Sequence, residues 1–484
     1  MPHLRASLLL SGLLALAACQ SRPDAAAETD TAATPCAPAA PARYTIRHPA
    51  WADSASIYEV NIRQYTPEGT FRAFEKHLPR LDSMGVGILW LMPVQPIGRL
   101  NRKGTLGSQY SIRDYRAVNP EFGTLDDLKH LIQAAHQRGM HVILDWVANH
   151  TSWDSQLRQQ HPDWFTRDAQ GRFQPPVADW QDVIDLDYHQ PELRRYMQHT
   201  MRYWVQEVGF DGFRCDVAGL VPMDFWNQTR RELEQVKPVF MLAEWDELHD
   251  PPFLKKGQFD PNTGMLEQAF DATYALRLRY LLDSISRGQQ PLAALDRYRQ
   301  VERRRYPASA YLMYFTTSHD INSWDGTEYE RLGANALPQA VLMALWPGIP
   351  MVYSGQEAAL KKRLRFFDKD TIPWRDFPLQ GFYAALLQLH RRHPALRNGD
   401  PCSSFQRLPE GSNRLYAFVR RKGAAAVLVA VNLDQQPHEL SLQGLGPGNW
   451  REIFSEQIVR LGSGSKLQLP AHGYRVYEQL PEQP

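Results

Sequence analysis

Hydrophobic residues follow two different periods along the chain from about residue 50 onward. Short apolar runs, typical of buried strands, alternate with longer stretches in which apolar residues recur every three or four positions, typical of amphipathic helices. Eight of the apolar runs are predicted to be strands: Ile57–Ile62, Val86–Met92, His141–Trp146, Phe210–Asp216, Val239–Glu244, Ala269–Thr273, Tyr311–Thr317 and Pro350–Tyr353. A strand followed by a helix, repeated in this way, favours an α/β fold with a closed (β/α)8 TIM barrel.

The clearest helix is predicted over Leu125–Arg138. Thr124 and Asp127 have the spacing of a capping box at its start, and Gly139 follows its last turn. A doubly wound open sheet would show a similar alternation of strands and helices. No Gly-x-Gly-x-x-Gly follows the first strand, however, so the barrel is the favoured interpretation.

Two segments depart from the alternation and predict further domains. After the third strand, residues 151–188 lack a strong helical period, and a connection of that length is usually functional. They are predicted to form a short subdomain inserted in the barrel, which is assigned residues 43–398. In residues 399–484 the apolar runs Leu415–Val419, Ala426–Val431 and Tyr474–Glu478 are separated by Gly, Pro and Asn, which predicts a C-terminal all-β sandwich.

The N-terminus is predicted to be an export signal over residues 1–19. Arg5 precedes the short apolar run Leu8–Leu16, and Leu16-Ala17-Ala18-Cys19 resembles a bacterial lipobox, in which Cys19 becomes the lipidated N-terminus. An ordinary secretory signal that ends near a cysteine is the alternative. Residues 20–42 are rich in Ala, Pro and Thr and are predicted to be a flexible linker.

This pattern predicts an exported protein, anchored to a lipid bilayer through Cys19. By resemblance to bacterial lipoproteins, Gln20 in place of an Asp is compatible with the outer membrane, facing either the periplasm or the cell surface. The remaining cysteines, Cys36, Cys215 and Cys402, are predicted to be unpaired thiols because they are few, odd in number and widely spaced.

Composition excludes several classes of protein. The chain has 484 residues, of which 43% are hydrophobic and 22% charged, as in ordinary globular proteins. With 54 Lys and Arg against 53 Asp and Glu, the net charge of +1 gives no electrostatic reason to expect a nucleic-acid partner.

Carboxylates follow four of the predicted strands, at the end of the barrel where active sites lie. Asp145, Asp216 and Glu244 end the third, fourth and fifth strands, and Asp320 follows the seventh. A single Asp in such a place is often only a helix cap. Four acidic groups that converge on one rim repel one another, which favours a functional explanation.

Glycoside cleavage is a reaction that uses paired carboxylates, and retaining enzymes hold the two about 5–5.5 Å apart. Neighbouring strands lie about 4.8 Å apart, so Asp216 and Glu244 suit the nucleophile and the acid/base. Arg214 is two residues before Asp216 and faces the same side of its strand. The exchanged assignment, with Glu244 as nucleophile, is the alternative, and an Arg beside Asp216 argues against it because a guanidinium keeps a carboxylate ionised.

Six motifs occur in the order found in the α-amylase family, glycoside hydrolase family 13. They are Tyr110-Ser111-Ile112-Arg113-Asp114-Tyr115 ahead of Asn119-Pro120 and Phe122-Gly123-Thr124, Asp145-x-x-x-Asn149-His150, Gly212-Phe213-Arg214-x-Asp216, Glu244, His319-Asp320, and the run from Gly348 to Glu357. The chain therefore resembles a bacterial lipoprotein member of that family, over roughly residues 51–480.

The resemblance implies a retaining glycoside hydrolase that acts on starch, maltodextrins or maltooligosaccharides without a cofactor for the chemistry. It implies that Asp320 stabilises the transition state, that Tyr110, His150, Arg214 and His319 bind substrate, and that Asp145 supports Arg214 from below. Six tryptophans are considered as sugar platforms, of which one or two are expected to serve: Trp146, Trp153, Trp164, Trp180, Trp245 and Trp324. The preferred linkage and the endo or exo mode are left open.

One departure from the family pattern bears on function. Many α-amylases carry a Lys-His pair soon after the nucleophile, where this chain has Gly219 and Leu220. A glucan transferase on the same site is therefore one alternative, since hydrolysis and transfer share a covalent intermediate. A non-catalytic glycan-binding lipoprotein is the other, although the three carboxylates are all present.

The resemblance also raises the question of a structural Ca²⁺, held by Asn149 with Asp185 or Asp187. Calcium takes six to eight oxygen ligands, and the sequence offers only two or three here. In the alternative interpretation, Asn149 simply hydrogen-bonds to the backbone.

Overall fold

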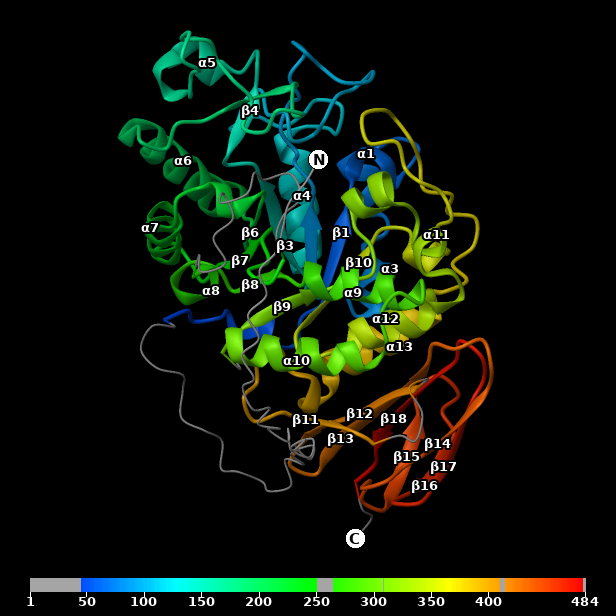
Figure 1. The fold of residues 1–484 in the computed structure, drawn as a ribbon. Helices are drawn as coiled ribbons and strands as arrows, with labels where there is room; N and C mark the ends of the chain where they lie inside the picture. The colour runs from blue at the N-terminus through cyan, green and yellow to red at the C-terminus, as the bar shows by residue number, and fades with distance from the viewer. Residues whose placement is uncertain (1–44, 250–263, 308, 410–412, 414, 482–484) are drawn as a thin grey trace, which may run out of the picture. The chain divides into compact units, whose positions relative to one another are not determined.

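Eight parallel strands close into a barrel in the computed structural model, which describes residues 45–249, 264–307, 309–409, 413 and 415–481 (Figure 1). Around the barrel the strand order is β1-β10-β9-β8-β7-β6-β3-β2. The bounds are β1 (Ile57–Val60), β2 (Ile88–Leu91), β3 (His141–Trp146), β6 (Gly212–Cys215), β7 (Phe240–Ala243), β8 (Ala272–Tyr274), β9 (Tyr311–Tyr314) and β10 (Ile349–Tyr353). Each overlaps a predicted strand, so the predicted TIM barrel is confirmed.

Helices follow the strands, as a (β/α)8 barrel requires (Figure 1). Their bounds are α1 (Ile62–Tyr65), α2 (Phe71–Glu75), α3 (Leu78–Met84), α4 (Leu125–His136), α6 (Pro191–Tyr203), α7 (Met223–Glu234), α8 (Met265–Gln268), α9 (Leu276–Ser286), α10 (Ala293–Arg305), α11 (Glu328–Leu332), α12 (Ala336–Leu345) and α13 (Gln380–Arg392). The start of α4 has the predicted capping box: the Asp127 N–H donates to Thr124 Oγ1 at 3.1 Å, and the Thr124 N–H donates to Asp127 Oδ2 at 2.9 Å.

The barrel strands are buried along their whole length, which explains why they appear as continuous apolar runs in the sequence. Three charged side chains interrupt this apolar interior, Glu59 in β1, Asp145 in β3 and Arg214 in β6, and all three residues are fully buried. A buried charge is costly unless it is paired and hydrogen-bonded. These three residues therefore indicate where the barrel holds a polar centre.

The segment after β3 forms a small antiparallel ladder of its own. Strand β4 (His150–Ser152) pairs with β5 (Val183–Asp185), and helix α5 (Gln156–Gln160) lies between them in sequence. The ladder puts His150 opposite Asp185. His150 therefore begins the ladder, only four residues after β3 ends.

An antiparallel all-β region follows the barrel, as predicted. Its strands are β11 (Ser404–Arg407), β12 (Leu415–Lys422), β13 (Ala425–Asn432), β14 (His438–Ser441), β15 (Gly448–Glu452), β16 (Ile458–Leu461), β17 (Lys466–Leu469) and β18 (Tyr474–Gln479). Six of them form one sheet in the order β11-β12-β13-β18-β15-β16, and β14 pairs with β17. Trp346, at the end of α12, packs its ring 5.2 Å from that of Phe405, which joins this sheet to the barrel. The exact domain boundaries stay a prediction.

The cysteine prediction was only partly right. Cys215 is a free, buried thiol at the end of β6, as predicted. Cys402 is disulfide-bonded, so the prediction was wrong for it. Cys19 and Cys36, the signal and the linker lie outside the described residues.

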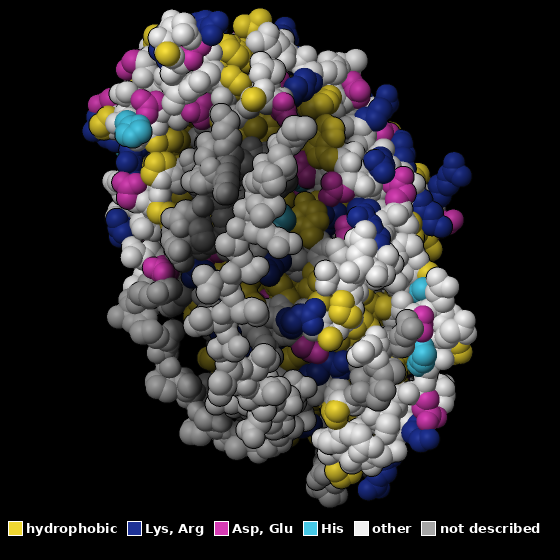
Figure 2. Space-filling view, in the orientation of Figure 1, with side chains coloured by type: hydrophobic (Ala, Val, Ile, Leu, Met, Phe, Trp, Pro, Cys, Tyr) yellow, Lys and Arg dark blue, Asp and Glu magenta, His cyan; other side chains and the backbone are white. Residues whose placement is uncertain are grey.

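Two further observations concern the surface and the membrane. Basic and acidic side chains are intermingled on the face shown in Figure 2, which agrees with the near-zero net charge of the sequence. Within the part of the chain that the structure describes, no helix is long and apolar enough to cross a bilayer.

Candidate active site

Arg214 is the centre of a carboxylate cluster at the C-terminal end of the barrel. Its Nη1 donates to Asp145 Oδ1 at 2.8 Å and to Asp216 Oδ1 at 3.0 Å, and its Nη2 forms an ion pair with Glu244 Oε2 at 2.8 Å. Its Nε donates to the Tyr274 hydroxyl at 3.1 Å. One guanidinium thus fixes three of the four carboxylates that the sequence singled out, from strands β3, β6 and β7.

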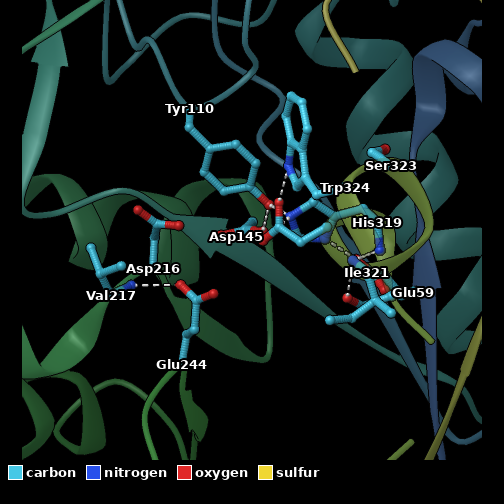
Figure 3. A network of polar contacts seen from close by, with 12 residues as sticks. Glu59, Tyr110, Asp145, Asp216, Val217, Glu244, His319, Ile321, Ser323 and Trp324 are labelled. Atoms are coloured by element: carbon cyan, nitrogen blue, oxygen red, sulfur yellow. Dashed lines mark hydrogen bonds and ion pairs between the residues drawn. The ribbon is translucent and has the colours of Figure 1, made fainter. Parts of the chain in front are cut away.

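Asp216 and Glu244 lie side by side because β6 and β7 are adjacent and in register (Figure 3). Cys215 pairs with Ala243, so each carboxylate is on the residue that follows a paired strand end. The N–H of Val217 donates to Glu244 Oε2 at 2.8 Å. The backbone directly after Asp216 therefore holds the carboxylate of Glu244.

The contacts of Arg214 change one argument from the sequence. We expected Arg214 to favour Asp216 over Glu244 as the nucleophile, but the guanidinium contacts both. It therefore cannot decide between the two assignments. Burial and the nearby Glu244 raise the pKa of Asp216 well above its ordinary value, and Arg214 opposes this only in part. Arg214 holds Asp216 in position, as predicted from the sequence, but it offsets only part of the effect of burial on the pKa of Asp216 because three carboxylates share that one cation.

Asp145 lies beneath this pair and is fully buried. Its Oδ2 accepts hydrogen bonds from Trp90 Nε1 at 3.0 Å and from the Tyr110 hydroxyl at 2.9 Å. Burial raises the pKa of Asp145 to about 6, against the opposing charge of Arg214. Asp145 thus orients Arg214 and Tyr110 from below, in the place that the sequence assigned to it.

Asp320 follows β9 and joins the cluster through His319 and Trp324. Its Oδ2 is 3.3 Å from His319 Nε2, and its Oδ1 accepts from Trp324 Nε1 at 3.2 Å. The His319 Nε2 is also 2.8 Å from the Tyr110 hydroxyl. Although burial alone would raise it, the pKa of Asp320 is lowered by the adjacent His319.

His150 is the first residue of β4 and lies beside Asp216. Its Nε2 is 3.8 Å from Asp216 Oδ2, and burial lowers the pKa of its imidazole to about 3. A neutral imidazole at this point can donate or accept a hydrogen bond. All eight predicted site residues other than Cys19 thus lie in one connected cluster.

Sequence reasoning missed three residues of this cluster. Glu59 in β1 contacts His319 through Nδ1, while Trp90 and Tyr274 contact Asp145 and Arg214. For Glu59 the signal was visible, since it is a charged residue in the middle of the apolar run Ile57–Val60. Trp90 and Tyr274 had no such signal, because aromatic residues are common in barrel strands.

The six tryptophans considered as sugar platforms differ sharply in exposure. Trp146, Trp164 and Trp245 are buried, Trp153 and Trp180 are partly buried, and Trp324 is 54% exposed. The Trp324 ring lies 5.1 Å from that of Phe366, which lies 6.2 Å from the Tyr110 ring. Trp324 is therefore the strongest of these candidates for a platform.

Gly219 shows why the Lys-His pair is missing. A Cβ at this position would lie 2.3 Å from the Trp245 ring, far inside van der Waals contact. Trp245 directly follows the acid/base candidate Glu244. The space next to the nucleophile candidate is thus filled from β7 by an aromatic ring, which leaves no room for a lysine side chain at 219.

The calcium ligands predicted from the sequence fit only part of a calcium shell. Asp185 is near Asn149, whose carbonyl accepts from the Leu186 N–H at 3.1 Å. Asp187 already accepts from the His189 N–H at 3.0 Å and from Gln190 Nε2 at 3.1 Å. Asp185 is engaged as well, since its Oδ2 accepts from Thr166 Oγ1 at 2.8 Å. Within the described ranges, no three His, Cys, Asp or Glu side chains are grouped to hold a metal.

Two family models match the chain. Residues 50–377 match the family model of the α-amylase catalytic domain, and residues 405–476 match that of the maltogenic amylase C-terminal domain. The chain is 27% identical over 410 residues to α-amylase MalA from Haloarcula japonica, which covers 81% of this chain and 57% of that protein. It is also 27% identical over 459 residues to a cyclomaltodextrinase from a Bacillus species, which covers 83% of this chain and 76% of that enzyme.

Among solved structures, an α-amylase from Lactobacillus plantarum has a TM-score of 0.78 and 31% identity. The match covers 89% of this chain and all of that one. The catalytic-domain model spans more than half of the sequence, and the barrel gathers the carboxylates of the matching motifs into one cluster. The chain therefore belongs to the α-amylase family of glycoside hydrolases.

Proposed function

We propose that this protein is a retaining hydrolase of α-linked glucans such as starch, maltodextrins and maltooligosaccharides. The observation that carries the proposal is the position of Asp216 and Glu244 on adjacent strand ends, both bound to Arg214. Asp216 would attack the anomeric carbon, and Glu244 would protonate the leaving oxygen and then activate water. Asp320 would stabilise the transition state between these two steps.

The charge of the cluster suits this chemistry. Five carboxyl groups meet two cationic side chains: Glu59, Asp145, Asp216, Glu244 and Asp320 against Arg214 and His319. An excess of negative charge favours a transition state that is oxocarbenium-like and carries positive charge. Binding of such a cation would also draw the pKa of Asp216 back down, and so support its ionised, nucleophilic form.

Product analysis on starch and on maltoheptaose, with and without an added acceptor sugar, tests the proposal. We expect shorter oligosaccharides as the main products, and the acceptor should change them little. Lengthened products would favour the transferase alternative. Glucan binding without any product would favour the non-catalytic alternative.

The transferase alternative is supported by one observation. The Trp245 ring fills the space beside Gly219. An aromatic surface therefore lies near the nucleophile, where many α-amylases have the Lys-His pair. An apolar wall favours a sugar face over water as a neighbour of the covalent intermediate. A minor transfer activity at high oligosaccharide concentration is therefore expected beside hydrolysis.

Removal of the exposed indole at Trp324 should weaken the binding of long substrates. We expect Trp324→Ala to raise KM for maltoheptaose about tenfold, and KM for maltotriose less, because a lost platform affects only the chains that reach it. Steady-state kinetics on both substrates measures this. Trp324→Phe keeps a ring but loses the N–H to Asp320, so it should preserve KM and lower kcat. If both variants had the KM of the wild type, Trp324 would not be a platform for the sugar.

A structural calcium ion at Asn149 and Asp185 stays a prediction. We expect added Ca²⁺ to raise the melting temperature of the wild type relative to protein treated with EDTA, and to leave that of Asp185→Asn unchanged. Identical melting of the wild type with Ca²⁺ and with EDTA would rule this ion out.

We also propose that the protein is exported and lipid-anchored through Cys19, on the evidence of the residues Leu16 to Cys19. Mass spectrometry of the mature N-terminus tests this. A diacylated cysteine that is lost in Cys19→Ala supports the anchor. An unmodified N-terminus released into the medium would support the ordinary secretory signal instead.

A further inference from the structure

Glu59 is a fully buried carboxylate that none of the proposed reaction steps uses. It lies in β1, in register with Trp90 of β2 and with Tyr353 of β10, and its side chain points into the barrel toward His319 (Figure 3). Its Oε1 is hydrogen-bonded to His319 Nδ1, and the His319 N–H lies 3.4 Å from the same oxygen. No donor among the described residues reaches its Oε2. The contact with His319 is therefore its main compensation for burial.

The hydrogen bonds around His319 determine which of its nitrogens carry protons. The Tyr110 hydroxyl has one proton, which it donates to Asp145 Oδ2 at 2.9 Å. The Tyr110 oxygen must then accept from His319 Nε2, which is 2.8 Å away. His319 Nδ1 faces the carboxylate of Glu59, which accepts when it is ionised. Both ring nitrogens are therefore donors, and an imidazole with two donors is a cation.

The charged and titratable groups that face His319 favour this cation. They come from four elements: Glu59 in β1, Tyr110 after β2, Asp145 in β3 and Asp320 after β9. Arg214 opposes them; its guanidinium lies over the Trp90 ring, 5.0 Å from the centroid, and over the Tyr110 ring at 5.6 Å. Burial alone would lower the pKa of His319, yet Asp320 and Glu59 together raise it well above its ordinary value.

We propose that Glu59 is a positioning residue that holds His319 as a two-donor imidazolium against Asp320. Among the described residues, Glu59 forms no hydrogen bond or ion pair with Asp320, Asp216 or Glu244, so it acts through the imidazole ring of His319. The cation keeps Asp320 ionised, and its Nε2, 3.3 Å from Asp320 Oδ2 and 2.8 Å from the Tyr110 hydroxyl, ties these two groups together. The effect of Glu59 on the pH dependence of glucan cleavage rests on the proposed function. Its effect on the protonation of His319 does not.

The structural consequence can be measured without any substrate. In the wild type labelled with ¹⁵N-histidine, the imidazole of His319, assigned through His319→Gln, should have a pKa well above its ordinary value because Asp320 and Glu59 favour the cation. In Glu59→Gln, which keeps the volume but removes the charge, its pKa should fall by at least about one unit. Titration of the wild-type ring near its ordinary value of about 6.5 would overturn the proposal, as would an unchanged pKa in the variant.

The kinetic consequence is a change in the shape of the pH profile. A neutral His319 lacks the charge that supports Asp320, so Glu59→Gln should lose activity first at alkaline pH. The alkaline limb of kcat/KM should move about one unit toward acid, and at pH 5.5 the variant should remain within a few fold of the wild type. A loss by the same factor at every pH would instead indicate a merely structural role and contradict the proposal.

Two further variants keep this test interpretable. Glu59→Asp retains the charge and should keep the wild-type alkaline limb, even if its rate is lower. Glu357→Gln is the matched control, since Glu357 is also fully buried, bonds to Tyr58 of β1 and pairs with Arg80 at 2.9 Å, away from His319. The Glu357→Gln variant should be less stable than the wild type but should keep the alkaline limb of the kcat/KM profile at the same pH. If no variant or wild type cleaves glucan, the proposed function fails, while the titration of His319 still decides the role of Glu59.

Discussion

Asp216→Asn should abolish glucan cleavage, with a fall in kcat of about 10⁴-fold or more. The substitution keeps the size of the side chain but replaces the anionic carboxylate by a neutral amide, whose oxygen is too weak a nucleophile to attack the anomeric carbon. It also removes one of three acidic partners of Arg214, whose contacts with Asp145 and Glu244 remain. Because that site is crowded with carboxylates, the variant should fold and should be at least as stable as the wild type. Rates on maltoheptaose and thermal melting measure the two effects.

Asp211→Asn is the matched control for this variant. Asp211 is also buried and lies at the other end of the same strand, directly before β6, where it pairs with Lys237 at 2.8 Å and with His136 at 2.7 Å. These partners lower the pKa of Asp211, although burial alone would raise it, so its charge stabilises the fold. We expect Asp211→Asn to melt earlier and to keep its activity. Substantial activity in Asp216→Asn would mean that another group attacks the sugar.

Arg214→Met should be the most damaging substitution in the barrel for both stability and catalysis. It leaves the buried Asp145 and Asp216 and the partly buried Glu244 without their shared cation. Removal of one partner from a buried ion pair costs about 3–5 kcal/mol. The pKa of Asp216 should rise further, so less of it is ionised at neutral pH and kcat should fall over the whole range. Urea unfolding gives the first effect and a pH profile gives the second.

Arg230→Met separates these two effects. Arg230 in α7 is equally buried and pairs with Asp271 at 2.6 Å and with Glu234 at 2.7 Å, away from the cluster around Arg214. Its loss should reduce the free energy of unfolding by a similar amount, while the folded fraction keeps the wild-type kcat. If Arg214→Met unfolded like the wild type and cut glucan normally, the cluster would not depend on its cation as described.

The fold could be predicted from the sequence because barrel strands and amphipathic helices have different hydrophobic periods. The strand His141–Trp146 and the capping box of Thr124 and Asp127 are as predicted. The ends of the strands were predicted less accurately. Strand β8, for example, starts at Ala272 rather than at the predicted Ala269. There Asp271 precedes the strand and accepts from the Met241 N–H at 2.8 Å and from Arg230, so its polar contacts delay the ladder.

The site residues that follow strand ends could be predicted, whereas their pairings could not. Asp145, Asp216, Glu244 and Asp320 were found because acidic residues at equivalent strand ends must converge. The sharing of Arg214 among three carboxylates depends on side-chain packing across β3, β6 and β7, which no local pattern encodes. The role of Trp245 in filling the space beside Gly219 is likewise a contact between strands. The disulfide of Cys402 was missed because its spacing indicates no pairing.

The central claim is that Asp216 and Glu244 cleave α-glucans through a covalent intermediate. Proton NMR of the first products from maltoheptaose, recorded before the anomers equilibrate, tests it most directly. The arrangement of the two carboxylates on adjacent strand ends predicts that the new reducing end appears as the α-anomer and changes slowly to the equilibrium mixture. A β-anomer as the first product would show single displacement by water and would contradict the assignment of Asp216 as nucleophile.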